Sequence, residues 1–268
     1  MNEISGIGKG DRNKLSTIFR KTKGTISVQD VADALKTTSS DAAKRLSRWA
    51  RKGWLSRISR GFYIRVPLES YTPDIPLEDP WIIAARLFSP CYVGGWSSAE
   101  YWGLTEQIFR TIIILTTKKP RNRSPIINGT AFMLRTIPEK ALFGIQPVWR
   151  GQVKVSVSDP SRTMIDLLMD VKLGGGIRPT MDVFSHYLNS EKRNIDLLIE
   201  YAKRIENGAV FKRLGYLLER LAPNQTQAIK ICADHLTKGN AKLDPSLDSK
   251  KLITRWKLWV PMNLGDID

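Results

Sequence analysis

The spacing of apolar residues predicts an amphipathic helix that ends at Gly53. Ala42, Leu46 and Trp49 recur at the i, i+4 and i+7 positions of one helix face, which is the spacing of a stripe that packs on a core. The residues from Thr38 to Asp41 have the S/T-x-x-D/E form of a capped helix start. Charged residues occupy the opposite face of this helix.

Two more helices are expected before it. Residues 12–23 carry inward-facing apolar positions and are followed by a glycine, which is a common helix stop. Ser27 and Asp30 form a capping-box pattern at the start of the second helix. Apolar residues at positions 28, 31, 32 and 35 of this helix have the i, i+3, i+4 and i+7 spacing of a core-facing stripe.

A β-hairpin is predicted directly after the third helix. Residues 54–58 and 62–66 are rich in strand-forming side chains, and the turn residues Ser59-Arg60-Gly61 lie between them. Helix, short extended segment, helix, turn, helix and hairpin is the order of a winged helix-turn-helix domain. In that fold the last helix enters the major groove of DNA and the hairpin, or wing, contacts the backbone or the adjacent groove.

The rest of the chain predicts a larger mixed domain. Residues 67–80 hold four prolines and several acidic residues, and are expected to form a linker. A short helix at 81–88, a buried strand at 112–116 and strands at 132–137 and 153–157 follow. Helices are predicted at 181–188, 195–205, 209–221 and 226–236, after a flexible break at Gly174–Gly176, and a last strand at 252–264.

The predicted fold class is therefore α+β. Residues 1–66 form a winged helix-turn-helix domain, residues 67–80 a linker, and residues 81–268 a larger mixed α/β domain that ends in a helical subdomain. This subdomain is expected to carry basic patches, offset by Glu200, Glu206 and Glu219; their residues are Arg193, Lys203, Arg204, Lys212, Arg213 and Arg220.

Positive charge is concentrated in the first domain. The chain has a net charge of +16, and residues 1–66 hold 15 basic and 5 acidic side chains, which gives them a net charge of +10. Such an excess favours a polyanionic partner. The candidate DNA-binding residues lie on the outer face of the third helix and near the wing: Ser40, Lys44, Arg45, Arg48, Arg51, Arg57 and Arg60.

Two other interpretations of these charges stay open. Basic residues on a helix often form only a solvated face, and a winged helix can also serve protein–protein contacts. A second basic segment, Lys118 to Arg123, is expected to be a solvated loop, with an auxiliary nucleic-acid or partner contact as the alternative.

Polar residues at the start of a helix in the second domain form another candidate site. Ser158 or Asp159 can cap this helix, and Arg162 and Asp166 are spaced i, i+4, so that they can pair. A capped helix with a local ion pair is the favoured interpretation, and a polar functional site is the alternative. Gly94-Gly95 precedes another helix, where a phosphate could bind, although close packing is the more common reason for two adjacent glycines.

The sequence lacks the motifs of the common enzyme classes. There is no P-loop, dinucleotide fingerprint or G-x-S-x-G elbow, and the two histidines have no partner at metal-ligand spacing. A Gly-Ser followed by paired aspartates, expected of a nucleotidyltransferase, does not occur. We therefore expect a binding protein without catalytic residues, metal or cofactor. Two distant cysteines, Cys91 and Cys232, and the lack of a signal peptide or membrane span indicate a cytoplasmic protein.

Four segments carry a resemblance to a known family. They are TTSSDAAKRLSRWARKGWLSRISRGFYI at 37–64, YVGGWSSAEYWGLTEQ at 92–107, VKVSVSDPSRTMIDLL at 153–168 and ENGAVFKRLGYLLE at 206–219. From about residue 10 to its end, the chain resembles the antitoxin and transcriptional regulator of the AbiE abortive-infection system, a type IV toxin–antitoxin pair.

This resemblance implies a bifunctional protein. The winged helix would bind inverted repeats in the promoter of its own operon and repress transcription. The larger domain would counteract a toxin that resembles nucleotidyltransferases, commonly without a stable complex. The alternatives are a DNA-targeted nuclease or nucleotide-modifying enzyme, which would need Glu139, Asp159 and Asp166 to converge on a metal, and a winged-helix module that does not bind DNA. The sequence leaves the oligomeric state open.

Overall fold

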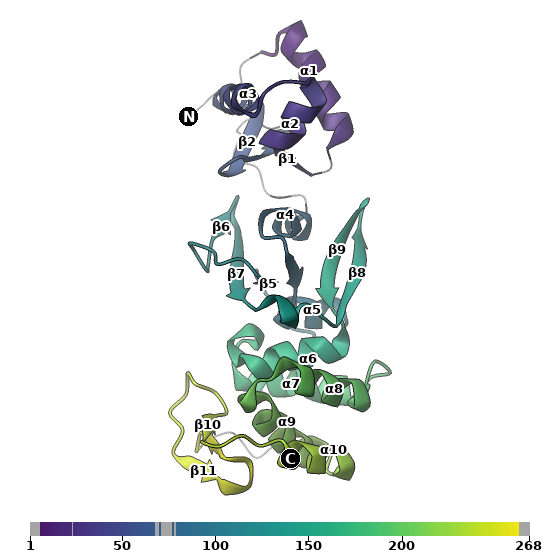
Figure 1. Ribbon diagram of the computed structural model, residues 1–268, viewed down its shortest axis with the longest axis vertical. Coiled ribbons are helices and arrows are strands. Elements are labelled where there is room, and N and C mark those ends of the chain that lie inside the picture. The colour runs from purple at the N-terminus through teal and green to yellow at the C-terminus, as the bar shows by residue number, and fades with distance from the viewer. Residues whose placement is uncertain (1–5, 23, 68–69, 71–76, 78, 263–268) are drawn as a thin grey trace.

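The computed structural model describes residues 6–22, 24–67, 70, 77 and 79–262. These residues form an elongated stack of layers (Figure 1): the N-terminal domain lies at one end, a mixed β-sheet in the middle, and a bundle of helices with a small sheet at the other end. The mixed α+β architecture predicted from the sequence is confirmed.

The N-terminal domain has the winged helix-turn-helix order. Its elements are α1 (Lys9–Lys21), β1 (Thr25–Ser27), α2 (Val28–Leu35), α3 (Ser39–Arg51), β2 (Leu55–Ser59) and β3 (Phe62–Arg65). The strands form an antiparallel sheet in the order β1-β3-β2, in which β2 and β3 are the wing. Apart from α1, which begins three residues earlier than expected, the predicted elements lie within a residue or two of the observed ones.

Local capping explains where the helices begin. Ser27 and Asp30 form the predicted capping box at α2, because the Ser27 hydroxyl accepts from the Asp30 amide and the Asp30 carboxylate accepts from the Ser27 amide. Thr38 caps α3 by accepting from the Asp41 amide at 3.1 Å. Gly53 has a φ of +77°, a conformation that suits glycine and lets the chain turn from α3 into the wing.

The middle layer is a six-stranded sheet. Its elements are α4 (Pro80–Leu87), β4 (Cys91–Val93), α5 (Gly95–Tyr101), β5 (Thr111–Thr116), β6 (Ile126–Ile127), β7 (Thr130–Thr136), the 3₁₀ turn η1 (Glu139–Ala141), β8 (Ile145–Arg150) and β9 (Val153–Ser158). The strand order is β6-β7-β5-β4-β9-β8, with parallel pairs at β5–β7 and β4–β9. The strands β5, β7 and β9 were predicted, whereas β4, β6 and β8 were not.

The sheet separates two hydrophobic cores. Along β5, Ile113 and Leu115 pack with the helices of the far layer, and Ile114 between them packs with α4 on the other face. All three side chains are fully buried, which confirms that a strand of continuous apolar residues lies inside the molecule.

The last layer contains the helical subdomain. It comprises α6 (Pro160–Met169), the 3₁₀ turn η2 (Val171–Gly174), α7 (Ile177–Asn189), α8 (Ile195–Ile205), α9 (Gly208–Leu221) and α10 (Thr226–Asp234). A small sheet completes it, formed by β10 (Ala241–Lys242), β11 (Lys251–Ile253) and β12 (Leu258–Val260), with the 3₁₀ turn η3 (Thr254–Trp256) between the last two.

Two predictions for this layer are wrong. Residues 252–262 are not one strand, because η3 reverses the chain and lets β11 pair antiparallel with β12; residues 263–264 lie outside the described residues. The segment Gly174–Gly176 is a packed turn and not an open break. A Cβ on Gly174 would lie 2.4 Å from the Thr180 hydroxyl oxygen, and Gly175 and Gly176 both have positive φ.

The winged helix rests on the middle layer through the inner face of its small sheet. Ile58 and Ile64 belong to the same hydrophobic core as Ile83 of α4 and Val155 of β9. An ion pair joins Arg86 of α4 to the capping residue Asp30, and the Asn128 amide donates to the Ser56 hydroxyl at 3.3 Å. The division into domains at 66 and 81 stays a prediction, and most of the expected linker lies outside the described residues.

No helix in the described part of the chain is long and apolar enough to cross a membrane.

A glycine inside α9 provides a stability test. Gly215 faces the ring of Trp256, and a Cβ at this position would lie 2.0 Å from a ring carbon. Alanine normally stabilises a helix by about 0.5–1 kcal/mol relative to glycine, but overpacking a core costs about 1–3 kcal/mol. We therefore expect Gly215→Ala to lower the free energy of unfolding by roughly 1–2 kcal/mol in urea titrations.

The matched control is Gly10→Ala. Gly10 lies in α1, where a Cβ would have no neighbouring atom within 4 Å, so the same substitution should be neutral or slightly stabilising. If Gly215→Ala and Gly10→Ala changed the free energy of unfolding equally, close packing against Trp256 would not be the reason for a glycine at position 215.

Candidate functional site

The outer face of α3 presents the predicted cationic side chains. Lys44, Arg48 and Arg51 are exposed, whereas Leu46 and Trp49 on the opposite face are fully buried. Figure 1 shows α3 at the end of the molecule that lies away from the helical bundle. This face is therefore free to meet a partner, as the sequence predicted.

One of these arginines has a partner within the domain. The Arg48 guanidinium lies 3.1 Å from a carboxylate oxygen of Asp11 on α1. Because the Arg48 side chain is about half exposed, such a pair contributes only about 0–1 kcal/mol. A phosphate or a guanine edge can replace this carboxylate, so the pair holds Arg48 in place without blocking it. Ser40 is exposed at the start of α3, and Arg45 is half-buried at its side.

The wing adds a second set of cations. Arg57 and Arg60 are both exposed, and Arg57 donates to the backbone oxygen of Ser59 at 3.4 Å. The register between β2 and β3 shifts between Arg57 and Ser59, and Gly61 has a φ of +80°, which closes the turn. The wing tip therefore carries its arginines at a tight, irregular turn.

Together, these residues can contact a nucleic-acid duplex in two ways. Lysine and arginine side chains neutralise phosphates and fix the orientation of the protein, without reading sequence. Guanidinium groups on a helix in the major groove can also donate two hydrogen bonds to a guanine edge. The structure exposes the predicted side chains of α3 and the wing, except for the half-buried Arg45, and their contact with DNA stays a prediction.

A further basic segment lies in the middle layer. Lys118, Lys119, Arg121 and Arg123 are exposed in the loop between β5 and β6. The adjacent β6–β7 hairpin contacts β2 of the wing through Asn128. The four basic side chains are therefore open to solvent, and whether they also contact a nucleic acid or another partner stays open.

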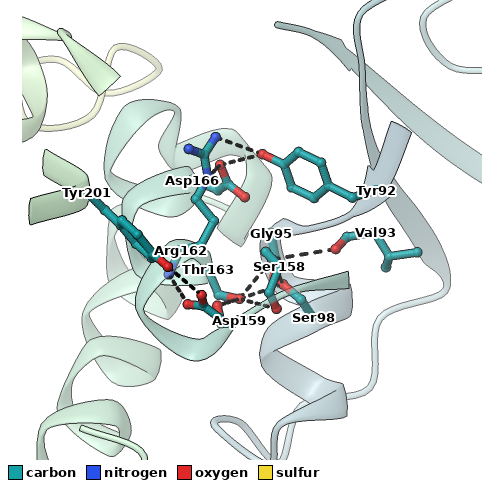
Figure 2. Close-up of polar contacts among 10 residues, drawn as sticks. All are labelled: Tyr92, Val93, Gly95, Ser98, Ser158, Asp159, Arg162, Thr163, Asp166 and Tyr201. Carbon is teal, nitrogen blue, oxygen red and sulfur yellow. Dashed lines mark hydrogen bonds and ion pairs between the residues drawn. The ribbon is translucent and has the colours of Figure 1, made fainter. Parts of the chain in front are cut away.

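The polar residues predicted in the second domain form a buried cluster (Figure 2). Asp159 caps α6 by accepting from the Arg162 amide at 2.8 Å, and its second carboxylate oxygen accepts from the Tyr201 hydroxyl at 2.9 Å. Burial raises the pKa of Asp159, although these hydrogen bonds oppose that shift. Burial and the bond to Asp159 raise the pKa of Tyr201 to about 12.

Arg162 and Asp166 form the predicted i, i+4 ion pair, with both side chains at 0 % exposure. Arg162 Nε lies 3.0 Å from Asp166 Oδ1, and Arg162 Nη2 donates to the Tyr92 hydroxyl at 2.8 Å. The Tyr92 hydroxyl in turn donates to Asp166 Oδ1 at 3.0 Å. Burial raises the pKa of Asp166 to about 6, against the attraction of Arg162.

Hydroxyl groups join α6 to the neighbouring strands and helix. Ser158, Ser98 and Thr163 lie within 2.9 Å of one another through their hydroxyl oxygens, and Ser98 also donates to the Gly95 carbonyl. The cluster therefore ties β4, α5, β9 and α6 together. Sequence reasoning missed Tyr92 and Tyr201, because a buried hydroxyl partner far away in the chain leaves no local pattern.

The glycine pair serves close packing and not phosphate binding. A Cβ on Gly94 would lie 2.4 Å from Leu115 and 3.0 Å from Asp166 Oδ2, and one on Gly95 would lie 2.6 Å from the Leu173 carbonyl. The space in front of this helix start is thus filled by the protein itself.

No metal centre forms from the residues that an enzyme would need. Among the described residues, no group of three or more histidine, cysteine or acidic side chains is placed to hold a metal ion. Asp159 and Asp166 are buried and hydrogen-bonded within the protein, whereas Glu139 is exposed in η1. These three carboxylates therefore do not make the converging site that a metal-dependent nuclease requires.

Two of the basic residues predicted on the helical surface lie inside it. Lys212 and Arg213 are buried in α9, where Lys212 donates to the Gly239 carbonyl and Arg213 to carbonyls that include those of Leu168 and Leu243. The prediction of surface charge is wrong for these two, because their helix is covered by the small sheet.

Burial also raises the pKa of Cys91 and Cys232 to about 12, so both thiols are protonated at neutral pH.

The ion pair in the cluster gives a pH-dependent prediction. Arg162→Met leaves Asp166 buried without its counter-charge, which costs about 3–5 kcal/mol when the carboxylate is ionised. Burial already raises the folded-state pKa of Asp166 to about 6 while Arg162 lowers it, so removing Arg162 should raise this pKa further. At pH 5 the carboxyl is then largely protonated with or without Arg162, whereas at pH 8 only the unmodified protein holds it as a paired carboxylate. We expect the loss in unfolding free energy to be largest at pH 8 and clearly smaller at pH 5 in urea titrations.

The double variant Arg162→Met/Asp166→Leu is the control. It removes both charges, so its unfolding free energy should recover part of the loss and should lack the extra pH dependence. A loss in Arg162→Met that stays constant between pH 5 and pH 8 would contradict an ionised, buried Asp166.

Comparisons with known proteins bear on the N-terminal domain. Residues 13–66 match the family model described as transcriptional regulator, AbiEi antitoxin. No curated protein matches the chain. The matched segment spans most of α1 and all of α2, α3 and the wing, and so includes the cationic surface described above. Residues 13–66 are therefore similar to the domain described by this family of transcriptional regulators and AbiEi antitoxins, and they have the winged-helix order.

Proposed function

We propose that this protein is a DNA-binding repressor of its own operon and the antitoxin of a toxin–antitoxin pair. The observation that carries the first half is the exposed face of α3, which holds Lys44, Arg48 and Arg51 in a domain that matches AbiEi regulators. The wing arginines Arg57 and Arg60 supply further phosphate contacts.

The proposed operator is a pair of inverted repeats in the promoter of the operon. Two copies of a helix-turn-helix domain bind half-sites that are separated by about one turn of DNA, or by multiples of it. In this proposal the N-terminal end of α3, with Ser40 and Lys44, reads base edges, as the first residues of a recognition helix do. Lys118, Lys119, Arg121 and Arg123 are candidates for an additional backbone contact.

The second half of the proposal assigns the antitoxin role to residues 81–268. Its support is the resemblance of three segments in this region to AbiE antitoxins, with a nucleotidyltransferase-like toxin as the proposed target. The structure gives these segments packing roles: Gly94 and Arg162 lie in the buried cluster, and Gly215 lies against Trp256. In this proposal the buried residues Asp159, Arg162 and Asp166 do not contact the toxin. They support antitoxin action indirectly, by stabilising the fold of this domain.

The first prediction concerns DNA affinity. Arg48→Ala should weaken binding of the full-length protein to its own promoter by about 1–3 kcal/mol in a gel-shift titration, provided that Arg48 contacts a base. Lys192→Ala, an exposed substitution in the turn between α7 and α8 of the helical layer, should leave the affinity unchanged.

Asp11→Asn separates DNA contact from domain stability. This variant removes the ion-pair partner of Arg48 but keeps the arginine, so its promoter affinity should equal or exceed that of the unmodified protein. If Asp11→Asn weakened binding as much as Arg48→Ala, the arginine would act through its contact with α1 and not through DNA.

The second prediction separates repression from antitoxin activity. The combined variant Lys44→Ala/Arg51→Ala/Arg57→Ala should lose repression of a promoter reporter and still protect cells that express the cognate toxin. Full-length variants are preferable to a fragment, because removing the winged helix would expose the apolar face around Ile83 that packs on Ile58 and Ile64. Loss of protection in a folded variant of this kind would show that the two activities depend on the same surface.

A further inference from the structure

A cavity lies between the winged helix and the middle layer. It has a volume of about 390 Å³, and we call it the interdomain cavity. The N-terminal domain contributes residues of α1, β1 and β3 to its walls, and the middle layer contributes α4 and the β8–β9 turn. Volumes of about 300–1,000 Å³ are typical of pockets that hold small molecules.

The inner walls of the interdomain cavity are apolar and come from both domains. Its lining includes Phe19, Ile26, Ile64, Ile82, Ile83 and Val153. Ile26 and Ile64 are buried on the small sheet, and Ile83 is buried on α4. These side chains form a surface on which an aliphatic or aromatic body can be removed from water.

The polar lining carries an excess of positive charge. Arg150 Nε lies 2.8 Å from a carboxylate oxygen of Asp79, so these two charges offset each other. Arg65 is exposed, and its guanidinium lies 5.3 Å from the centre of the Phe19 ring. Arg65 makes no ion pair with any residue in the described ranges. A stacked arginine without a carboxylate partner can donate to an anionic group while its other face stays on the ring.

We propose that the interdomain cavity binds a small organic anion with an apolar body. The body lies between Ile64 and Ile82, and the anionic group accepts hydrogen bonds from Arg65 at the edge of the cavity. A carboxylate suits this position, since it can take two hydrogen bonds from one guanidinium group. The proposal is independent of the proposed DNA and toxin partners, because none of its residues lies on the outer face of α3 or at the wing tip.

Such a ligand would touch both domains at once. The cavity lies where the end of α1 approaches the β8–β9 turn, and Figure 1 shows this region on the opposite side of the molecule from α3. An occupant therefore leaves the DNA-facing surface free and adds contacts across the junction between the domains.

The test is isothermal titration calorimetry of the full-length protein with three probes. 4-Phenylbutanoate has both the body and the charge, 4-phenylbutanamide has the body without the charge, and acetate has the charge without the body. We expect 4-phenylbutanoate to bind with a stoichiometry of one, the amide to bind about tenfold more weakly, and acetate to show no binding at the same concentrations.

Three variants locate the site. Arg65→Gln should weaken 4-phenylbutanoate binding about tenfold, and Arg65→Lys, which keeps the charge, should weaken it less. Arg110→Gln, an exposed substitution in the loop before β5, should not alter binding. Val153→Trp should fill the cavity and abolish binding, and its thermal unfolding curve shows whether this variant is folded. The two Arg65 variants test the same site without altering its apolar walls.

Equal affinity for the acid and the amide would overturn the assignment of an anion. Unchanged binding in Arg65→Gln, or in a folded Val153→Trp variant, would overturn the location. Absence of binding by 4-phenylbutanoate at millimolar concentration would overturn the proposed class of ligand.

Discussion

Burial of one stripe of α3 determines how the N-terminal domain meets its partner. A helix that packs Ala42, Leu46 and Trp49 into a core has its rotation about the helix axis fixed, because all three side chains are at 0 % exposure. Lys44, Arg48 and Arg51 must then face outward, whatever the rest of the chain does. The cap at Thr38 and the turn at Gly53 set the ends of the helix, and thus the position at which the wing begins. Apolar contacts on one face of α3 therefore determine the direction in which its cationic side chains point.

The same domain is coupled to the rest of the molecule by its other face. Ile58 and Ile64 of the wing strands share a core with α4 and the six-stranded sheet, and Asp30 serves both as a helix cap and as the partner of Arg86. Motion between the N-terminal domain and the middle layer would have to expose this apolar surface. The interdomain cavity lies at this junction, where an occupant would add contacts to both sides.

The sequence predicted the local features of the fold well and the long-range ones poorly. Capping residues, glycine stops and apolar periodicity depend on neighbours within one or two turns, and they located α2, α3, the wing and α8 closely. The Arg162–Asp166 pair was predicted for the same reason, since its members are four residues apart. Tyr92, Tyr201 and Arg213 acquire their roles from partners more than 25 residues away, and the covering of α9 by the small sheet reversed the expectation for Lys212. Strand β4 likewise pairs only with the distant strands β5 and β9. In contrast, β6 and β8 each form a hairpin with the next strand through a two-residue turn, Asn128-Gly129 and Gly151-Gln152, and these turns are local signals that the sequence analysis overlooked.

The central claim is that cations on α3 and the wing neutralise the phosphates of a duplex. Its most direct test is the salt dependence of promoter binding by the full-length protein, compared with the variant Lys44→Ala/Arg51→Ala/Arg57→Ala. Each phosphate contact that is removed should reduce the slope of log K against log salt concentration by about 0.9. We expect a slope that is smaller by about two to three units in this variant. Identical slopes for the two proteins, or binding that does not depend on salt, would contradict the claim.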